Sequence, residues 1–108
     1  MPKSVFLGEF EQLVLLTLLR LGDEAYALPA LTELSRIAGR PVSRGALYRT
    51  LDRLSEKDFV RWVVEEKVAG RGGHPRRRFT VRPSGVAALK ASRNALLDLW
   101  TGVEEVLE

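Results

Sequence analysis

The sequence of 108 residues contains no cysteine and only one histidine, His74. Without cysteine the chain can form neither disulfides nor thiolate metal sites, and it lacks a thiol nucleophile. A single histidine between a glycine and a proline suggests neither a Ser-His-Asp arrangement nor a metal site. We therefore expect no enzyme, no metal and no cofactor, and the lack of cysteine suits a reducing, cytoplasmic setting.

Long apolar runs are also lacking. The longest, LVLLTLLRL at 13–21, is less than half of the about 20 residues that a membrane-spanning helix needs. The N-terminal segment carries glutamates before any sustained apolar run, which is unlike a signal peptide. Hydrophobic residues still make up 45% of the chain, so we expect one soluble domain with a modest core and no membrane association.

Positive charge is concentrated in two short segments. The chain has a net charge of only +3, but 43–57 carries four basic and two acidic residues, and 70–82 carries five arginines and no acid. The remaining residues are mildly acidic in sum. A surface that serves solubility mixes the two signs, whereas a face that binds a polyanion separates them. The distribution predicts a polyanion-binding face.

The spacing of apolar residues predicts three helices, two strands and a final helix, in that order. The expected ranges are 8–21, 26–38 and 44–57 for the helices, 59–68 and 77–82 for the strands, and 83–108 for the last helix. Gly39 and Pro41 end the second helix, and Ser43 is a suitable N-cap for the third. The order is mainly α with a small β-hairpin (α+β), as in a winged helix-turn-helix.

Most predicted elements have one apolar face. We expect the buried positions of the second and third helices at Leu31, Leu34, Ile37 and Ala38, and at Leu47, Leu51 and Leu54. In the strands the apolar faces are formed by Val60, Trp62 and Val64, and by Phe79 and Val81. The segment GRGGHPRRR (70–78) between the strands has a flexible, basic composition, which is typical of a wing that contacts phosphates.

Three stretches of the sequence resemble the PadR family of bacterial transcriptional regulators. They are AYALPAL (25–31), LYRTLDRLSEKDFV (47–60) and GGHPRRRFTVRPSGVAAL (72–89). The second resembles the recognition helix that opens with Leu-Tyr, and the third resembles the Gly-rich wing with its Pro-x-Gly helix entry. The resemblance covers roughly residues 8–90. It implies a winged-helix repressor, usually dimeric through its first and last helices and often relieved by a small molecule.

The third helix and the wing hold the candidate DNA-binding residues. If this helix enters a major groove, its N-terminal part and the face opposite the leucines point at the bases. The candidates on the helix are Ser43, Arg44, Gly45, Tyr48, Arg49 and Arg53. Those on the wing are Arg71, His74, Arg76, Arg77 and Arg78. The competing interpretation for both groups is a solvated, charged surface.

Two other functions remain open from the sequence. A winged helix that serves as a protein–protein adaptor keeps the leucine pattern, but it has no evident reason to gather positive charge on one helix and one loop. An RNA-binding protein favours exposed aromatic residues for stacking on bases, and Tyr48 is the obvious candidate here. We expect double-stranded DNA as the partner.

The last helix predicts a homodimer. Positions 86, 89, 93, 96, 100, 103 and 107 are spaced by three and four residues, and six of these seven are apolar. With the first helix, they give the expected dimerisation residues Leu15, Leu19, Leu89, Leu96, Trp100, Val103 and Leu107. We expect 1–82 to form the DNA-binding domain and 83–108 the dimerisation helix of one compact unit. Trp100 is also a candidate for an aromatic effector pocket, or it fills the dimer core.

Overall fold

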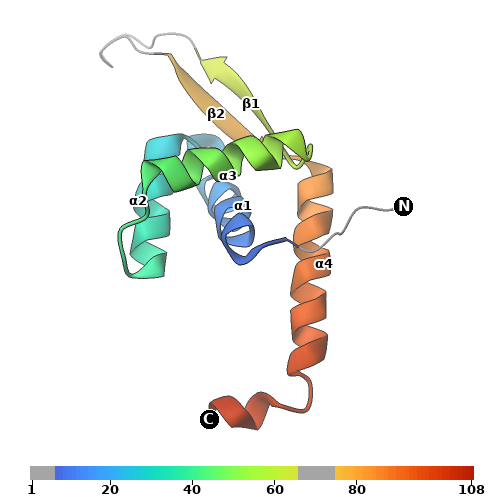
Figure 1. Ribbon diagram of the computed structural model, residues 1–108. Coiled ribbons are helices and arrows are strands. Elements are labelled where there is room, and N and C mark those ends of the chain that lie inside the picture. Colours follow the sequence, from blue (N-terminus) through green and yellow to red (C-terminus); the bar gives the residue numbers. More distant parts are fainter. Residues whose placement is uncertain (1–6, 66–74) are drawn as a thin grey trace.

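A computed structural model describes residues 7–65 and 75–108 of the chain (Figure 1). The predicted order of elements is confirmed. The helices are α1 (Glu9–Leu21), α2 (Ala27–Ala38), α3 (Arg44–Glu56) and α4 (Pro83–Trp100), the strands are β1 (Val60–Glu65) and β2 (Arg76–Val81), and short 3₁₀ turns are η1 (Gly22–Glu24) and η2 (Glu104–Leu107). Figure 1 shows the hairpin beside α3 and the far end of α4 at the opposite end of the molecule.

Local signals in the sequence fix the ends of the first three helices. The Glu11 carboxylate accepts a hydrogen bond of 2.9 Å from the Gly8 amide and so caps α1. Gly39 ends α2 in the left-handed region, with φ of 70°. Ser43 caps α3 by accepting a hydrogen bond of 3.1 Å from the Ala46 amide. The predicted caps at Gly39 and Ser43 are confirmed.

The core lies between α1, α2 and α3, and it is closed by the start of α4 and the base of the hairpin. Its largest buried apolar side chains are Val14, Leu15, Leu18, Leu34, Leu47, Leu51, Leu54, Val60, Phe79 and Leu89. The buried face predicted for α3 is confirmed. For α2 the prediction was wrong at Ile37 and Ala38, which are exposed, because the helix turns Ala30 and Leu34 toward the core while its last turn stands in solvent.

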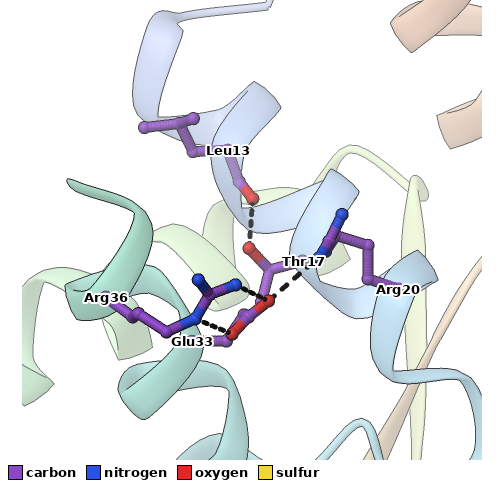
Figure 2. Close-up of polar contacts among 5 residues, drawn as sticks. All are labelled: Leu13, Thr17, Arg20, Glu33 and Arg36. Atoms are coloured by element: carbon purple, nitrogen blue, oxygen red, sulfur yellow. Dashed lines mark hydrogen bonds and ion pairs between the residues drawn. The ribbon is translucent and has the colours of Figure 1, made fainter.

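An ion-pair cluster joins α1 to α2 on the surface (Figure 2). The Glu33 carboxylate accepts two hydrogen bonds of 2.9 Å from Arg36 and one of 3.3 Å from Arg20. These bonds, those from Arg36 first, hold the pKa of Glu33 below its ordinary value. Because both arginine side chains are largely exposed, the cluster contributes little stability, and only the Arg20–Glu33 pair connects the two helices.

The hairpin is antiparallel, with Val60 opposite Val81 and Trp62 opposite Phe79. Val60 and Phe79 are buried, but Trp62 and Val64 are 41% and 53% exposed. The apolar face predicted for β1 is therefore covered only at its base, because the strands run out beyond the helices (Figure 1). A third segment pairs with β2 at its other edge through a bridge between Tyr26 and Arg78.

The last helix is shorter than predicted. It ends at Trp100, and η2 then runs in a different direction (Figure 1). The chain turns at Gly102, whose φ of 93° is a conformation that favours glycine, and the Gly102 amide donates a 2.8 Å hydrogen bond to Glu104. The prediction of one helix over 83–108 was wrong, and Val103 and Leu107 do not continue the apolar row of α4.

Candidate nucleic-acid interface

The six candidate residues of α3 form one exposed surface. Leu47, Leu51 and Leu54 fix the orientation of the helix, because their burial turns the opposite side to solvent. The exposed residues are Ser43, Arg44, Gly45, Tyr48, Arg49 and Arg53. We call these six residues the α3 basic face. Its assignment to DNA stays a prediction, but its geometry allows every member to reach a ligand.

Two of the arginines on the α3 basic face contact their own helix. Arg53 donates a 3.2 Å hydrogen bond to the hydroxyl of Thr50. The guanidinium of Arg49 folds back toward the start of the helix, where a Cβ atom on Gly45 would lie 3.1 Å from its Nη1. Both contacts use flexible side chains, so the guanidinium groups can exchange them for a base or a phosphate.

The three arginines of β2 have different surroundings. Arg76 lies over the ring of Tyr26, 3.6 Å from its centroid, and Arg77 lies over Trp62 at 4.3 Å. Such stacking orients a guanidinium without cancelling its charge. Arg78 instead donates a 2.9 Å hydrogen bond to the Glu65 carboxylate, which balances its charge. The other wing candidates, Arg71 and His74, lie outside the described residues.

Sequence reasoning missed Tyr26 and Glu65. The Tyr26 hydroxyl donates a short hydrogen bond to Glu65, and the bond raises the pKa of Tyr26 and lowers that of Glu65, with Arg78 lowering the latter further. The two residues are 39 positions apart, so no local pattern pairs them. The available signals were a tyrosine just before α2 and an acid at the end of the strand that pairs with the basic strand β2.

A hollow of about 550 Å³ lies between the hairpin and the helices. It lies between the start of α2, the N-terminal half of α3 and β2, and its lining includes Tyr26, Pro29, Tyr48, Arg76, Arg77 and Phe79. Aromatic rings and two guanidinium groups suit the sugar and phosphate of a nucleic-acid strand. Within 7–65 and 75–108, no group of His, Cys, Asp or Glu side chains is placed to hold a metal ion.

The outer part of α4 and the turn after it carry a second apolar surface. Leu96, Leu99, Trp100 and Val103 are exposed and line a shallow hollow of about 270 Å³. Of the other predicted dimerisation residues, Leu19 and Leu107 are exposed. Leu15 and Leu89 are buried in the core of their own chain, so they are not accessible to a partner. No helix in the described part of the chain is long and apolar enough to cross a membrane.

The elements described above are those of a winged helix-turn-helix protein, with α2 and α3 as the helix pair and the hairpin as the wing. Comparison of the sequence with family models and with curated proteins gives no match. Solved structures do match, and they identify the type of winged helix.

The fold is similar to that of a PadR-like transcription factor from Bacteroides fragilis, with a TM-score of 0.69 and 24% identity over 90% of this chain and 88% of that one. A PadR family transcriptional regulator from Eggerthella lenta gives a TM-score of 0.67 and 25% identity over 93% and 87%. For a transcriptional regulator from Thermoplasma acidophilum the values are 0.67 and 16% over 91% and 89%. The chain has the PadR type of winged-helix fold, and the resemblance inferred from its sequence is confirmed.

Proposed function

We propose that this chain is a transcriptional regulator that binds double-stranded DNA in a sequence-specific manner, and that it acts as a repressor. One observation carries the proposal. Tyr48 of the α3 basic face and Arg76 and Arg77 of the hairpin line the same hollow. A single duplex can therefore contact the helix and the hairpin together. The PadR-type fold, which the solved regulators share, supports the same function.

The two parts of the interface have different roles in this proposal. The α3 basic face enters the major groove, where Arg44 and Arg49 donate to base edges. The hairpin lies along the backbone, where Arg76 and Arg77 contact phosphates and add affinity that depends little on sequence. Because Arg78 is paired with Glu65, it adds less to phosphate binding than its two neighbours.

We propose further that the regulator is a homodimer that binds a near-palindromic operator. The exposed apolar surface of Leu96, Leu99, Trp100 and Val103 is the part of α4 that its own chain leaves uncovered. Residues 1–82 then carry the DNA-binding part and 83–108 the dimer contact, within one unit. A two-fold axis at this surface presents two copies of α3 to two half-sites.

The hollow beside Trp100 is also the proposed site for an aromatic effector that relieves repression. The hollow has an apolar lining and is open to solvent. In the proposed dimer, two such hollows related by a two-fold axis would enclose a flat ligand from both sides. The simpler assignment is that Trp100 fills the dimer core. Quenching of tryptophan fluorescence by planar aromatic compounds, lost in Trp100→Phe and retained in Trp62→Phe, distinguishes the two.

A mobility-shift experiment tests the central proposal. The wild-type protein is titrated into the duplex upstream of its own gene, a scrambled duplex of the same composition and a single strand. We expect the upstream duplex to bind at the lowest protein concentration. Equal binding of both duplexes would show a DNA-binding protein without sequence preference. A preference for the single strand favours recognition of the RNA type. No binding to any of the three favours a protein–protein adaptor.

A further inference from the structure

The carboxylate of Glu65 ties three separate segments of the chain together. One of its oxygens accepts from the Tyr26 hydroxyl, just before α2, and the other accepts from Nε of Arg78 in β2. Glu65 itself is the last residue of β1. Its side chain is about one-third exposed, and Tyr26 is buried. A single acid therefore connects both strands of the hairpin to the start of the helix pair.

Tyr26 is also held by the hairpin in two other ways. Its backbone pairs with that of Arg78, and the neighbouring Ala25 carbonyl accepts a 2.9 Å hydrogen bond from the Phe79 amide. Its ring lies under the guanidinium of Arg76. The angle at which the hairpin leaves the helical body is thus set around this tyrosine.

Apolar packing does little to hold the outer part of the hairpin. In β1 only Val60 is buried, and Val63 and Val64 are 40% and 53% exposed. A segment with few buried contacts is held in place by its polar contacts, and it opens more easily when they are lost. Glu65 supplies two of these polar contacts at the outer end of the hairpin, because it is paired with Arg76, the first residue of β2.

An acid on a polyanion-binding face is unfavourable unless it organises its neighbours, because it repels phosphate. This inference rests on the proposed DNA-binding function. We propose that Glu65 is a positioning residue that contributes to the preference for one DNA sequence. It fixes the hairpin so that Arg76 and Arg77 meet the same duplex as the α3 basic face, and it withholds Arg78 from phosphates. Its loss strengthens binding to a random duplex and weakens the preference for the correct one.

The experiment compares four variants with the wild-type protein. Glu65→Ala removes both hydrogen bonds, Glu65→Gln keeps an acceptor for Tyr26 without the charge, and Tyr26→Phe keeps the ring under Arg76 without the hydroxyl. Glu9→Gln is the matched control, because it removes the same charge from an exposed side chain in the first turn of α1, outside both parts of the proposed DNA interface and outside residues 83–108. Affinity is measured over a range of salt concentrations for a duplex selected by the wild-type protein and for a random duplex.

For Glu65→Ala we expect the ratio of selected to random affinity to fall about tenfold, since the helix and the hairpin no longer engage together. On the random duplex the slope of log affinity against log salt steepens by about 0.9, which corresponds to one additional phosphate contact by the released Arg78. Glu65→Gln lowers the ratio less, and Glu9→Gln leaves the ratio and the slope unchanged. If Glu65→Ala shifts both affinities by the same factor, Glu65 is merely a repulsive charge and the proposal is wrong.

Tyr26→Phe tests the positioning role without changing any charge. We expect it to lower the affinity ratio while the salt slope stays that of the wild-type protein, because Arg78 remains paired. This variant decides the question if Glu65→Ala does not fold, which circular dichroism detects. If Tyr26→Phe and Glu65→Gln, measured separately, both keep the wild-type ratio of selected to random affinity, the proposal is wrong.

Hydrogen exchange of the Phe79 amide gives a readout that needs no DNA. This amide donates to Ala25, so its protection reports the attachment of the hairpin to the helical body. We expect exchange about tenfold faster in Glu65→Ala, with the core amides of α3 unchanged. Equal exchange rates in both proteins overturn the positioning role. A wild-type protein without duplex preference overturns the proposed function instead, so the two failures are distinguishable.

Discussion

The Nζ atom of Lys57 lies 2.8 Å from Oε2 of Glu11. Lys57 follows the last turn of α3, and Glu11 lies in the first turn of α1, so the pair joins the end of one helix to the start of another. The same carboxylate accepts from the Gly8 amide. The Glu11 side chain is buried, whereas the Lys57 side chain is partly exposed to solvent. The pair therefore holds the end of α3 against α1 at the edge of the core.

Glu11→Gln should lower the free energy of unfolding at pH 7 by about 1–2 kcal/mol, the lower range for a charged hydrogen bond whose partner is partly solvated. Glutamine still accepts from Gly8, so the loss reports the ion pair. Denaturant unfolding measures it. Glu9→Gln, which removes an equal charge from the same turn, is the control and should stay within about 0.5 kcal/mol of the wild-type protein.

The difference between the wild-type protein and Glu11→Gln should also depend on pH. Burial raises the pKa of Glu11, but the hydrogen bonds from Lys57 and Gly8 outweigh it, so the pKa lies below its ordinary value of 4.5. A lowered folded-state pKa means that the stabilisation is complete above about pH 4.5 and is lost as the pH falls through the folded-state pKa. A difference that stays constant down to pH 3 contradicts this assignment.

Gly85→Ala should destabilise the fold by about 1–3 kcal/mol, the usual cost of overpacking. A Cβ atom at this position would lie 2.5 Å from the carbonyl oxygen of Phe59 and 3.0 Å from Cγ1 of Val81. The Phe59 carbonyl accepts from the Arg82 amide at the start of α4, so it cannot move away freely. Thermal unfolding measures the effect, and a melting temperature equal to that of the wild-type protein would show that α4 can shift.

Gly45→Ala should have the opposite effect on stability and still weaken DNA binding. The new Cβ meets only the mobile end of Arg49, so replacing glycine in a helix should stabilise the protein by up to about 1 kcal/mol. In the proposed complex the backbone of α3 approaches the duplex at this glycine, and a methyl group there obstructs it. A higher melting temperature with unchanged affinity for the selected duplex would remove Gly45 from the interface.

Local patterns were sufficient to predict α3, but not the end of α4. The spacing of Leu47, Leu51 and Leu54 and the hydroxyl of Ser43 act within a few residues, so the sequence predicts the buried face and the cap correctly. The apolar pattern of α4 continues past Gly102, and one glycine costs a helix only about 1 kcal/mol. The turn at Gly102 therefore could not be inferred from periodicity.

The candidate interface could likewise be predicted only in part from local patterns. The exposure of the α3 basic face follows from the buried face of the same helix. The contacts of the hairpin arginines with Tyr26 and Glu65 depend on the pairing of β2 with the segment before α2, which brings together residues far apart in the chain. A charge count treats Arg76 and Arg78 as equal, whereas their surroundings distinguish them.

Arg49→Ala and Arg77→Ala should weaken DNA binding in different ways. If Arg49 reads a base, its loss costs about 1–3 kcal/mol on the selected duplex and much less on a random one. Loss of Arg77, a phosphate contact in the proposed complex, weakens both duplexes equally and flattens the salt slope by about 0.9. Fluorescence anisotropy at several salt concentrations measures both variants. Equal losses on the two duplexes for Arg49→Ala would make it a phosphate contact.

The exposed surface of α4 predicts that the protein in solution has twice the mass of the 12.1 kDa chain. Leu96 and Leu99 are 50% and 76% exposed, next to Trp100 and Val103. An apolar cluster of this kind is unfavourable in water, and a symmetric partner that contributes the same residues covers it on both sides. Since α4 ends at Trp100, the contact depends on the second half of the helix and on the turn that follows.

Leu96→Glu should therefore give a monomer, because two glutamates would face each other across the two-fold axis in a desolvated contact. Ile37→Glu is the matched control: Ile37 is also an exposed apolar residue, at 55%, but it lies in the last turn of α2. Light scattering at micromolar concentration should give the dimer mass for the wild-type protein and Ile37→Glu and the chain mass for Leu96→Glu. In the same series, Leu96→Glu should lose the selected duplex but retain weak binding to random DNA, since one α3 reaches only one half-site. A wild-type protein with the mass of one chain refutes the dimer directly.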